Sequence, residues 1–157
     1  MAEVQWAIRP AREADAEAIS RVIVQTLRLS NAADYPSQVI ERVAANFDAG
    51  GVRGLMKSRQ VFVALDDERV VATASLAGDV VRSVFVLPEM QGRGVGKALM
   101  RHIEGVALAA GVQQLRVPAS LTAVPFYKAL GYAVVRKVVE GDERTLVMAR
   151  QLDYGFS

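Results

Sequence analysis

The sequence predicts one mixed α/β domain over residues 1–157, and three observations support that class. The chain is 52% hydrophobic and 23% charged, which is typical of a globular domain of common size. β-Branched runs with a period of two alternate with runs whose apolar residues recur every three or four positions. The order of these runs is β-α-α-β-β-β-α-β-α-β-β, as expected for a single mixed sheet with helices.

The first third of the chain is expected to form one strand and two helices. Residues 2–9 alternate weakly before a proline, which suggests a short strand. Apolar residues recur at helical spacing from Asp15 onward, and a second helical pattern begins at Ser37, a plausible N-cap. The glycine-rich segment 48–59 has no clear period and is expected to be irregular.

The remaining elements follow from the same periods. Short turns separate three β-branched runs, so a meander is expected over 60–65, 70–76 and 80–87. A glycine turn then leads into a helix that ends near Ala110, where Gly111 is a natural stop. A short strand, a short helix and a final hairpin complete the chain at 114–117, 122–130, 132–139 and 144–152.

Composition and charge exclude several classes of function. The chain has no cysteine, which removes disulfides, a thiolate metal site and a cysteine nucleophile. Its 19 basic and 17 acidic residues are scattered, so nucleic-acid binding is not indicated, although an anionic small ligand fits the charge. The single histidine, His102, has no partner ligands, and no metal is expected. No apolar run approaches the roughly 18 residues of a membrane span and no secretory signal is evident, so we expect a cytoplasmic protein.

The stretch 91-QGRGVGKALM-100 predicts an anion site. Its three alternate glycines permit positive φ angles and close approach of the backbone. The free N–H groups at the start of the following helix, together with the helix dipole, favour a bound anion. The glycines are Gly92, Gly94 and Gly96, and the cations beside them are Arg93 and Lys97. Taken alone, these residues also fit a surface turn without a ligand.

Two nucleotide-binding motifs nearly match this turn, and both fail at an essential position. A Walker loop would need a glycine in place of Gln91 and a metal-binding hydroxyl in place of Ala98. A dinucleotide fingerprint that starts at Gly92 would need a glycine in place of Lys97. The turn therefore predicts a phosphate compound held in some other way.

A second stretch, 117-VPASLTAVPFYKALGY-132, decides between these alternatives. Its pattern from Ala123 through Tyr132, together with Q-x-x-G-x-G at 91–96, resembles the two motifs of the GNAT family of N-acetyltransferases. The opening 8-IRPAREAD-15 is similar to the first strand and helix entry of the family. One departure is Ser120, which stands where the family usually has asparagine.

The resemblance implies direct transfer of an acetyl group from acetyl-CoA to a primary amine of a small molecule, an amino acid or a peptide. It implies that the strand before the glycine turn splays from the strand after the helix, with pantetheine between them. The pyrophosphate would lie on the backbone N–H groups of the turn. The implied contacts to acetyl-CoA are Val84, Phe85, Val86, Gln91, Gly92, Arg93, Gly94, Val95, Gly96, Lys97 and Ser120.

The resemblance also implies that Tyr127 is the general acid that protonates the departing CoA thiolate. A phenol can do so only when it lies within hydrogen-bond reach, and the alternative is an aromatic residue that merely packs in the core. The base stays open, because the strand 80–87 contains no acid. Asp79, at its start, is one candidate and a water relay is the other. The absence of cysteine favours direct transfer in a ternary complex.

The lack of an acid on that strand motivates a second hypothesis, a non-catalytic module of the same fold that binds CoA. The acceptor is expected to contact the variable segments 28–58 and 136–147, which contain no acidic cluster typical of a polyamine pocket. Homodimerisation is common in the family and is a possible partner interaction here.

Overall fold

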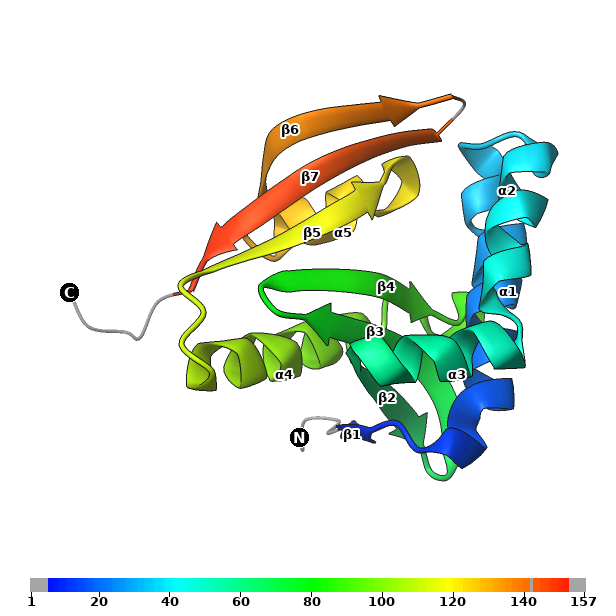
Figure 1. Ribbon diagram of the computed structural model, residues 1–157, viewed down its shortest axis with the longest axis horizontal. Coiled ribbons are helices and arrows are strands. Elements are labelled where there is room, and N and C mark those ends of the chain that lie inside the picture. The colour runs from blue at the N-terminus through cyan, green and yellow to red at the C-terminus, as the bar shows by residue number, and fades with distance from the viewer. Residues whose placement is uncertain (1–5, 142, 153–157) are drawn as a thin grey trace.

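The computed structural model describes residues 6–141 and 143–152 of the chain (Figure 1). Its seven strands form one mixed sheet in the order β1-β2-β3-β4-β5-β7-β6. Neighbouring strands are antiparallel except β4 and β5, which are parallel. The strands are β1 (Ala7–Pro10), β2 (Gln60–Asp66), β3 (Arg69–Ala77), β4 (Val80–Val86), β5 (Gln114–Ser120), β6 (Ala133–Glu140) and β7 (Glu143–Gln151).

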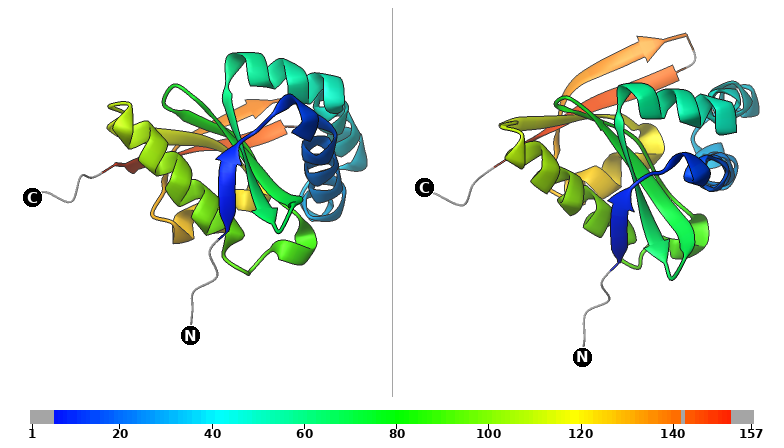
Figure 2. Two further views of the ribbon diagram at one scale, coloured as in Figure 1. Left: turned by 90° about the horizontal axis from the view of Figure 1, so that it is seen from below. Right: turned by 60° about the horizontal axis from the view of Figure 1, so that its bottom comes forward.

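Helices cover both faces of the sheet. Helix α1 contacts β3 and β4 from one side, and α4 contacts β2, β3 and β4 from the other (Figure 2). The helices are α1 (Ala16–Leu29), α2 (Ser37–Ala44), α3 (Ala49–Ser58), α4 (Val95–Ala109) and α5 (Val124–Ala129). Within the described chain, every helix is too short or too polar to cross a membrane.

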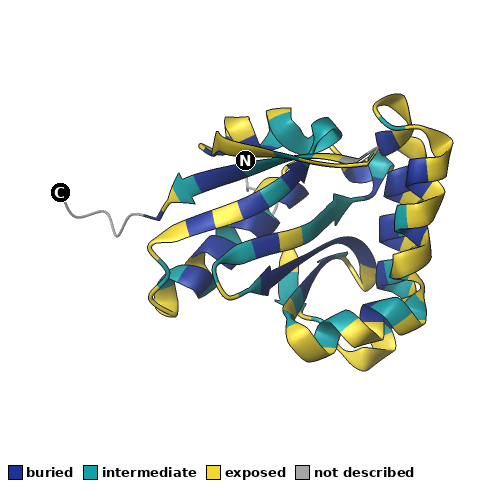
Figure 3. Ribbon diagram, turned by 45° about the horizontal axis from the view of Figure 1, so that its top comes forward, coloured by how far each residue is buried: buried dark blue, intermediate teal, exposed yellow. Residues whose placement is uncertain are grey.

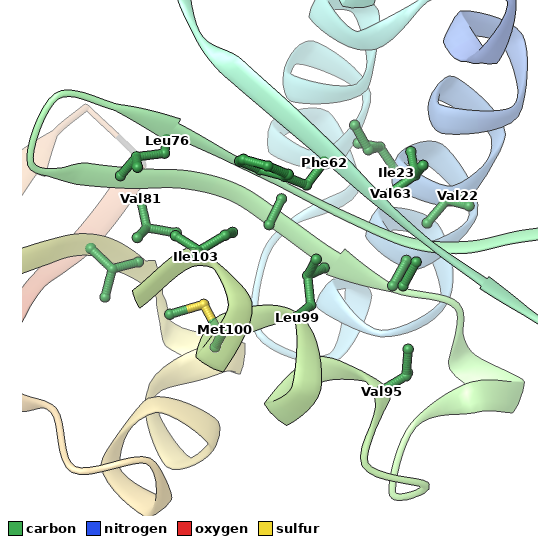
Figure 4. Close-up of a cluster of buried hydrophobic side chains, with 14 of the residues drawn as sticks. Val22, Ile23, Phe62, Val63, Leu76, Val81, Val95, Leu99, Met100 and Ile103 are labelled. Carbon is green, nitrogen blue, oxygen red and sulfur yellow. The ribbon is translucent and has the colours of Figure 1, made fainter. Parts of the chain in front are cut away.

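The core consists of two layers of side chains, one on each face of the sheet (Figure 4). Leu99 and Ile103 of α4 are fully buried, and Ile103 lies beside Val81 of β4. On the opposite face, Val22 of α1 packs near Val63 of β2. Burying such side chains contributes roughly 1.5–3 kcal/mol each. This packing on both faces fixes β2, β3 and β4, against which the rest of the sheet is positioned.

The mixed α/β class and the predicted order of elements are confirmed, with one helix added. The segment expected to be irregular, 48–59, forms α3, so that prediction is wrong. The Asp48 carboxylate accepts the N–H of Gly51 at 2.7 Å and caps this helix. Ser37 is the first residue of α2 rather than its N-cap, which is Pro36. Residues 2–5 of the expected first strand lie outside the described residues.

Candidate active site

Strands β4 and β5 pair at one end and separate at the other. The described register joins them at Val80 and Arg116, where the N–H of Arg116 donates to the carbonyl of Asp79 at 3.0 Å. Beyond this point the two strands diverge (Figure 1). Residues 83–86 and 117–120 line a shared cavity, which we call the central cavity. The predicted splay is confirmed. It leaves two inner strand edges with backbone groups that no neighbouring strand takes up.

A β-bulge marks the place where β4 leaves β5. Ser83 has a φ of +57°, a left-handed conformation that is uncommon for a residue with a side chain. The register of β3 and β4 slips here, so that Ser83 and Val84 lie opposite the single residue Ala74. Nη1 of Arg59 donates to Oγ of Ser83 at 3.2 Å and holds the bulge from the side of α3. Because a bulge bends its strand, it opens the gap toward β5.

The register beyond the bulge decides which backbone groups of β4 face the cavity. The N–H of Leu87 donates to the carbonyl of Val71 at 3.0 Å, so this is a hydrogen-bonded pair. Since such pairs alternate along antiparallel strands, the backbone of Phe85 faces β3. The backbone groups of Val84 and Val86 face the open edge. Phe85 therefore lines the cavity with its ring rather than with its amide.

Gln91 connects the glycine turn to α1. Its Nε2 donates to the Val86 carbonyl at 3.1 Å and to Oγ of Ser30 at 3.1 Å. Oγ1 of Thr26 lies 3.2 Å from the same Val86 carbonyl. The Val86 carbonyl is therefore occupied, and the N–H groups of Val84 and Val86 are the backbone donors at the edge.

The central cavity has a volume of about 600 Å³ and joins the glycine turn, both strand edges, α5 and the α1–α2 region. Ten of the residues expected to form the site line it: Val84, Phe85, Val86, Gln91, Gly92, Gly94, Gly96, Lys97, Ser120 and Tyr127. Two others do not. The guanidinium of Arg93 lies over the ring of Trp6, 5.8 Å from its centroid, and the Val95 side chain is buried in the core.

The glycine turn has the geometry of an anion site. Gly92 and Gly94 have φ angles of +77° and +92°, which only glycine adopts readily. The first hydrogen bond of α4 runs from the N–H of Ala98 to the carbonyl of Gly94 at 3.0 Å. The amides of residues 95–97 precede this bond and have no partner within the helix.

Tyr127 is buried, yet it lines the cavity. Its ring packs edge-on against the rings of Phe126 and Tyr132, at centroid distances of 5.1 and 5.8 Å. No hydrogen bond joins its hydroxyl to another described residue. Burial raises the pKa of Tyr127, so the hydroxyl keeps its proton at neutral pH. The residue is thus part of the core and also presents a proton to the cavity.

A buried carboxylate, which the sequence did not single out, ties α4 to β7 and to the segment between α5 and β6. Oε2 of Glu104 accepts the hydroxyl of Tyr132 at 2.7 Å. Its Oε1 accepts Nη1 of Arg101 at 2.6 Å and Nη1 of Arg150 at 3.0 Å. The available signal was the spacing of four from Met100, which places Glu104 on the buried face of the helix.

The described residues that line the cavity include no aspartate or glutamate. Asp79 lies at the closed end of the β4–β5 pair, where its carboxylate accepts Nη2 of Arg116 at 3.2 and 3.3 Å. The structure therefore separates this candidate base from Tyr127 and does not bring it to the site. His102 is also outside the lining, with its ring 5.2 Å from that of Phe62.

Polar groups of the α1–α2 connection line the cavity and were not predicted individually. Asn31 is 7% exposed, and no described residue hydrogen-bonds its side-chain amide. The hydroxyl of Tyr35 accepts the N–H of Leu121 at 2.8 Å and donates to the carbonyl of Arg144 at 3.0 Å. These bonds tie the connection to β7 and to the end of β5.

Comparisons with known proteins agree with this geometry. An acetyltransferase (GNAT) domain model matches residues 57–134, from the end of α3 into β6. The uncharacterised N-acetyltransferase YafP of Escherichia coli strain K12 is 28% identical over 130 residues, 83% of each protein. A GCN5-related N-acetyltransferase structure from Rhodopseudomonas palustris is 26% identical, with a TM-score of 0.90 over 97% of this chain and 99% of its own.

More distant structures share the fold. The PaiA N-acetyltransferase of Thermoplasma acidophilum, in complex with coenzyme A, has a TM-score of 0.78 at 17% identity over 94% of this chain and 99% of its own. The domain match, the YafP relative and the Rhodopseudomonas palustris structure together identify the protein as an N-acetyltransferase. It belongs to the GNAT family, as its two sequence motifs indicated.

Proposed function

We propose that the protein transfers an acetyl group from acetyl-CoA directly to a primary amine of a small molecule, an amino acid or a peptide. The observation that supports this most strongly is the single cavity that unites the anion site of the glycine turn, two open strand edges and the hydroxyl of Tyr127. The coenzyme A in the PaiA structure supports the choice of cofactor.

The lining residues fit acetyl-CoA. The amides of residues 92–97 and the Lys97 ammonium suit a pyrophosphate. The edge of β4 and the Ser120 hydroxyl, which here replaces an amide side chain, suit the polar groups of a pantetheine arm. Acetyl-CoA would supply the activated acetyl group as a thioester.

The residues of the chain would act at three atoms of the reaction. The N–H of Val84 would donate to the thioester oxygen, where negative charge develops as the amine attacks. A C–N bond forms and the C–S bond breaks, and Tyr127 would give its proton to the departing sulfur. Burial raises the pKa of Tyr127, so the hydroxyl holds its proton until the sulfur departs.

The proton of the attacking amine would leave through water. No carboxylate of the described chain lines the cavity, while the amide of Asn31 is buried and free to hold a solvent molecule. An amine that reaches the cavity already in its neutral form needs no base before it attacks. We therefore keep a water relay as the proposed base.

The wall on the α1–α2 side favours an acceptor with an apolar body. Its apolar members are Leu27, Val39, Ile40, Val43 and Phe85. A polycationic amine would find no acid there, which argues against polyamines as acceptors.

Calorimetric titration with acetyl-CoA and an acetylation assay on a panel of amines test this function. We expect saturable binding that weakens when Lys97 is replaced by glutamine, while Lys57→Gln, an exposed control on α3, leaves it unchanged. Absence of binding at millimolar acetyl-CoA would overturn the proposal.

A further inference from the structure

A second hollow lies on the sheet face that carries α1–α3, over strands that these helices leave uncovered. Its volume is about 430 Å³. Pro118 and Val147 belong to its apolar floor, and Arg82, Arg116 and Arg136 supply its cations. Residues of β5 alternate between buried and more exposed positions (Figure 3). Arg116 and Pro118 are among the more exposed ones. We call this hollow the arginine groove.

The strand register explains why the arginines gather there. Pro118 of β5 pairs with Val147 of β7, and Val147 pairs with Arg136 of β6, so the three lie in one row across the sheet. Arg82 is two residues beyond Val80, the residue that faces Arg116. Alternate residues of a strand share a face, so Arg82 and Arg136 approach the same apolar floor from β4 and from β6.

Most of this positive charge is not neutralised within the protein. Arg116 forms an ion pair with Asp79 at 3.2 Å. Arg82 and Arg136 make no ion pair with a described residue, and Glu140 is the one acid of the described lining. Burial, and then the charge of Arg82, lower the pKa of Arg59. The guanidinium of Arg59 is therefore near that of Arg82 and adds to the local positive potential. Across the whole chain basic and acidic residues are nearly balanced, at 19 to 17, so the groove is more basic than the chain average.

The groove adjoins the central cavity. Pro118 and Thr145 line both of them. Arg144, next to Thr145, adds a cation to the lining of the cavity itself. A group joined to an amine in the cavity can therefore pass over Pro118 into the groove.

We infer that the acceptor carries a carboxylate, which Arg82 and Arg136 bind in the arginine groove while its amino group lies in the central cavity. A guanidinium matches a carboxylate with two parallel hydrogen bonds. Glu140 at the rim favours a singly charged carboxylate over a doubly charged phosphate. This inference rests on the proposed acetyl transfer and names the class of its acceptor.

Matched amine pairs test the inference: alanine, leucine and β-alanine, each beside its carboxamide. We expect at least one acid to have a KM roughly tenfold below that of its amide, the difference typical of a charge-assisted contact. The amine of the carboxamide is less basic, so more of it is in the neutral form that can attack. A lower KM for the acid therefore could not come from amine ionisation. Arg82→Gln and Arg136→Gln should raise the KM of the acid roughly tenfold and leave the KM values of the amide and of acetyl-CoA unchanged. Arg21→Gln, an exposed control on α1, should change none of them.

Equal KM values for acids and amides, with acetylation intact, would overturn the inference and leave the proposed function standing. A binding measurement that needs no catalysis further separates the carboxylate inference from the proposed acetyl transfer. N-acetylleucine added to ¹⁵N-labelled protein should shift arginine side-chain Nε–H resonances that disappear in Arg82→Gln or Arg136→Gln, whereas N-acetylleucinamide should not. No such shift with N-acetylleucine would overturn the carboxylate site, whether or not any amine is acetylated.

Discussion

Gly96 of α4 and the ring of Phe126 in α5 meet so closely that a β-carbon on Gly96 would lie 3.0 Å from Cε1 of Phe126. Real β-carbons hardly ever come nearer than this. The helix whose first amides form the proposed phosphate site and the helix that carries Tyr127 therefore touch through a glycine. The backbone of Gly96 is helical, so any residue could adopt its conformation. A glycine is therefore needed at this position for the close contact with Phe126 and not for the turn.

Gly96→Ala should lower both the affinity for acetyl-CoA and the kcat. A methyl group must displace Phe126, and with it α5, by a few tenths of an ångström; losses of that kind reach about 1–3 kcal/mol. Calorimetry and steady-state kinetics measure the effect, and Phe126→Leu in the same chain should restore part of it.

Gly105→Ala is the matched control in the same helix, where a β-carbon meets open space. It should raise the free energy of unfolding by about 0.5–1 kcal/mol with unchanged kinetics. Wild-type binding and turnover by Gly96→Ala would contradict the contact.

Tyr127→Phe should lower kcat by roughly 100-fold or more while the Kd for acetyl-CoA stays the same, because the variant loses a proton donor and keeps the ring. Burial raises the pKa of Tyr127, so the protonated donor persists upward in pH. Any alkaline loss of kcat caused by this residue should therefore lie above the ordinary tyrosine pKa of about 10. Unchanged turnover in Tyr127→Phe would show that another group protonates the thiolate.

Tyr132→Phe and Glu104→Ala should both lower the free energy of unfolding, the second more than the first. The tyrosine variant loses one hydrogen bond to a charged group, worth roughly 1.5–3 kcal/mol. The alanine variant also leaves two arginines without their shared acceptor. Urea unfolding at neutral pH measures the difference, and a loss from Glu104→Ala no larger than that from Tyr132→Phe would contradict the role of the network.

Asp15→Asn should lower the stability of the protein at pH 7 but not at pH 2. The hydrogen bond from Arg9 at 2.7 Å holds the pKa of Asp15 below its ordinary value. A carboxyl group with a lowered folded-state pKa stabilises the fold above its unfolded-state pKa, near 3.9, and that contribution is lost as the pH falls through the folded-state value. We expect a difference of about 1 kcal/mol at pH 7, by urea unfolding, that disappears in acid. A difference that stays constant down to pH 2 would contradict this assignment.

The order of the elements along the chain could be predicted from the sequence because it follows from local patterns, whereas the opening between β4 and β5 was implied by the resemblance to the GNAT family. Period-two runs mark the strands, and the stop glycines Gly111 and Gly131 have the positive φ angles that a helix end requires. Helix α3 could not be predicted in this way. Glycines interrupt its pattern and Val52 is its one buried residue among those described, so its cap and its packing on α1 decide its structure.

The details of the site depended on register, which periodicity does not reveal. The bulge at Ser83 adds one residue to β4, and this decides that Val84 and Val86, rather than Phe85, turn their amides to the cavity. Tertiary packing, and not a local pattern, also decides which end of the β4–β5 pair is closed. It places Asp79 against Arg116 instead of beside Tyr127.

The inner edges of β4 and β5 also bear on how the protein avoids unwanted association. An unpaired strand edge normally recruits other polypeptides, and proteins protect their outer edges for that reason. Here two such edges face one another across a cavity of about 600 Å³ instead of facing solvent. A slender, extended molecule can add to these edges as a strand would, whereas the edge strand of another folded protein would first have to enter the cavity. The fold thus keeps these strand edges away from the outer surface of the sheet.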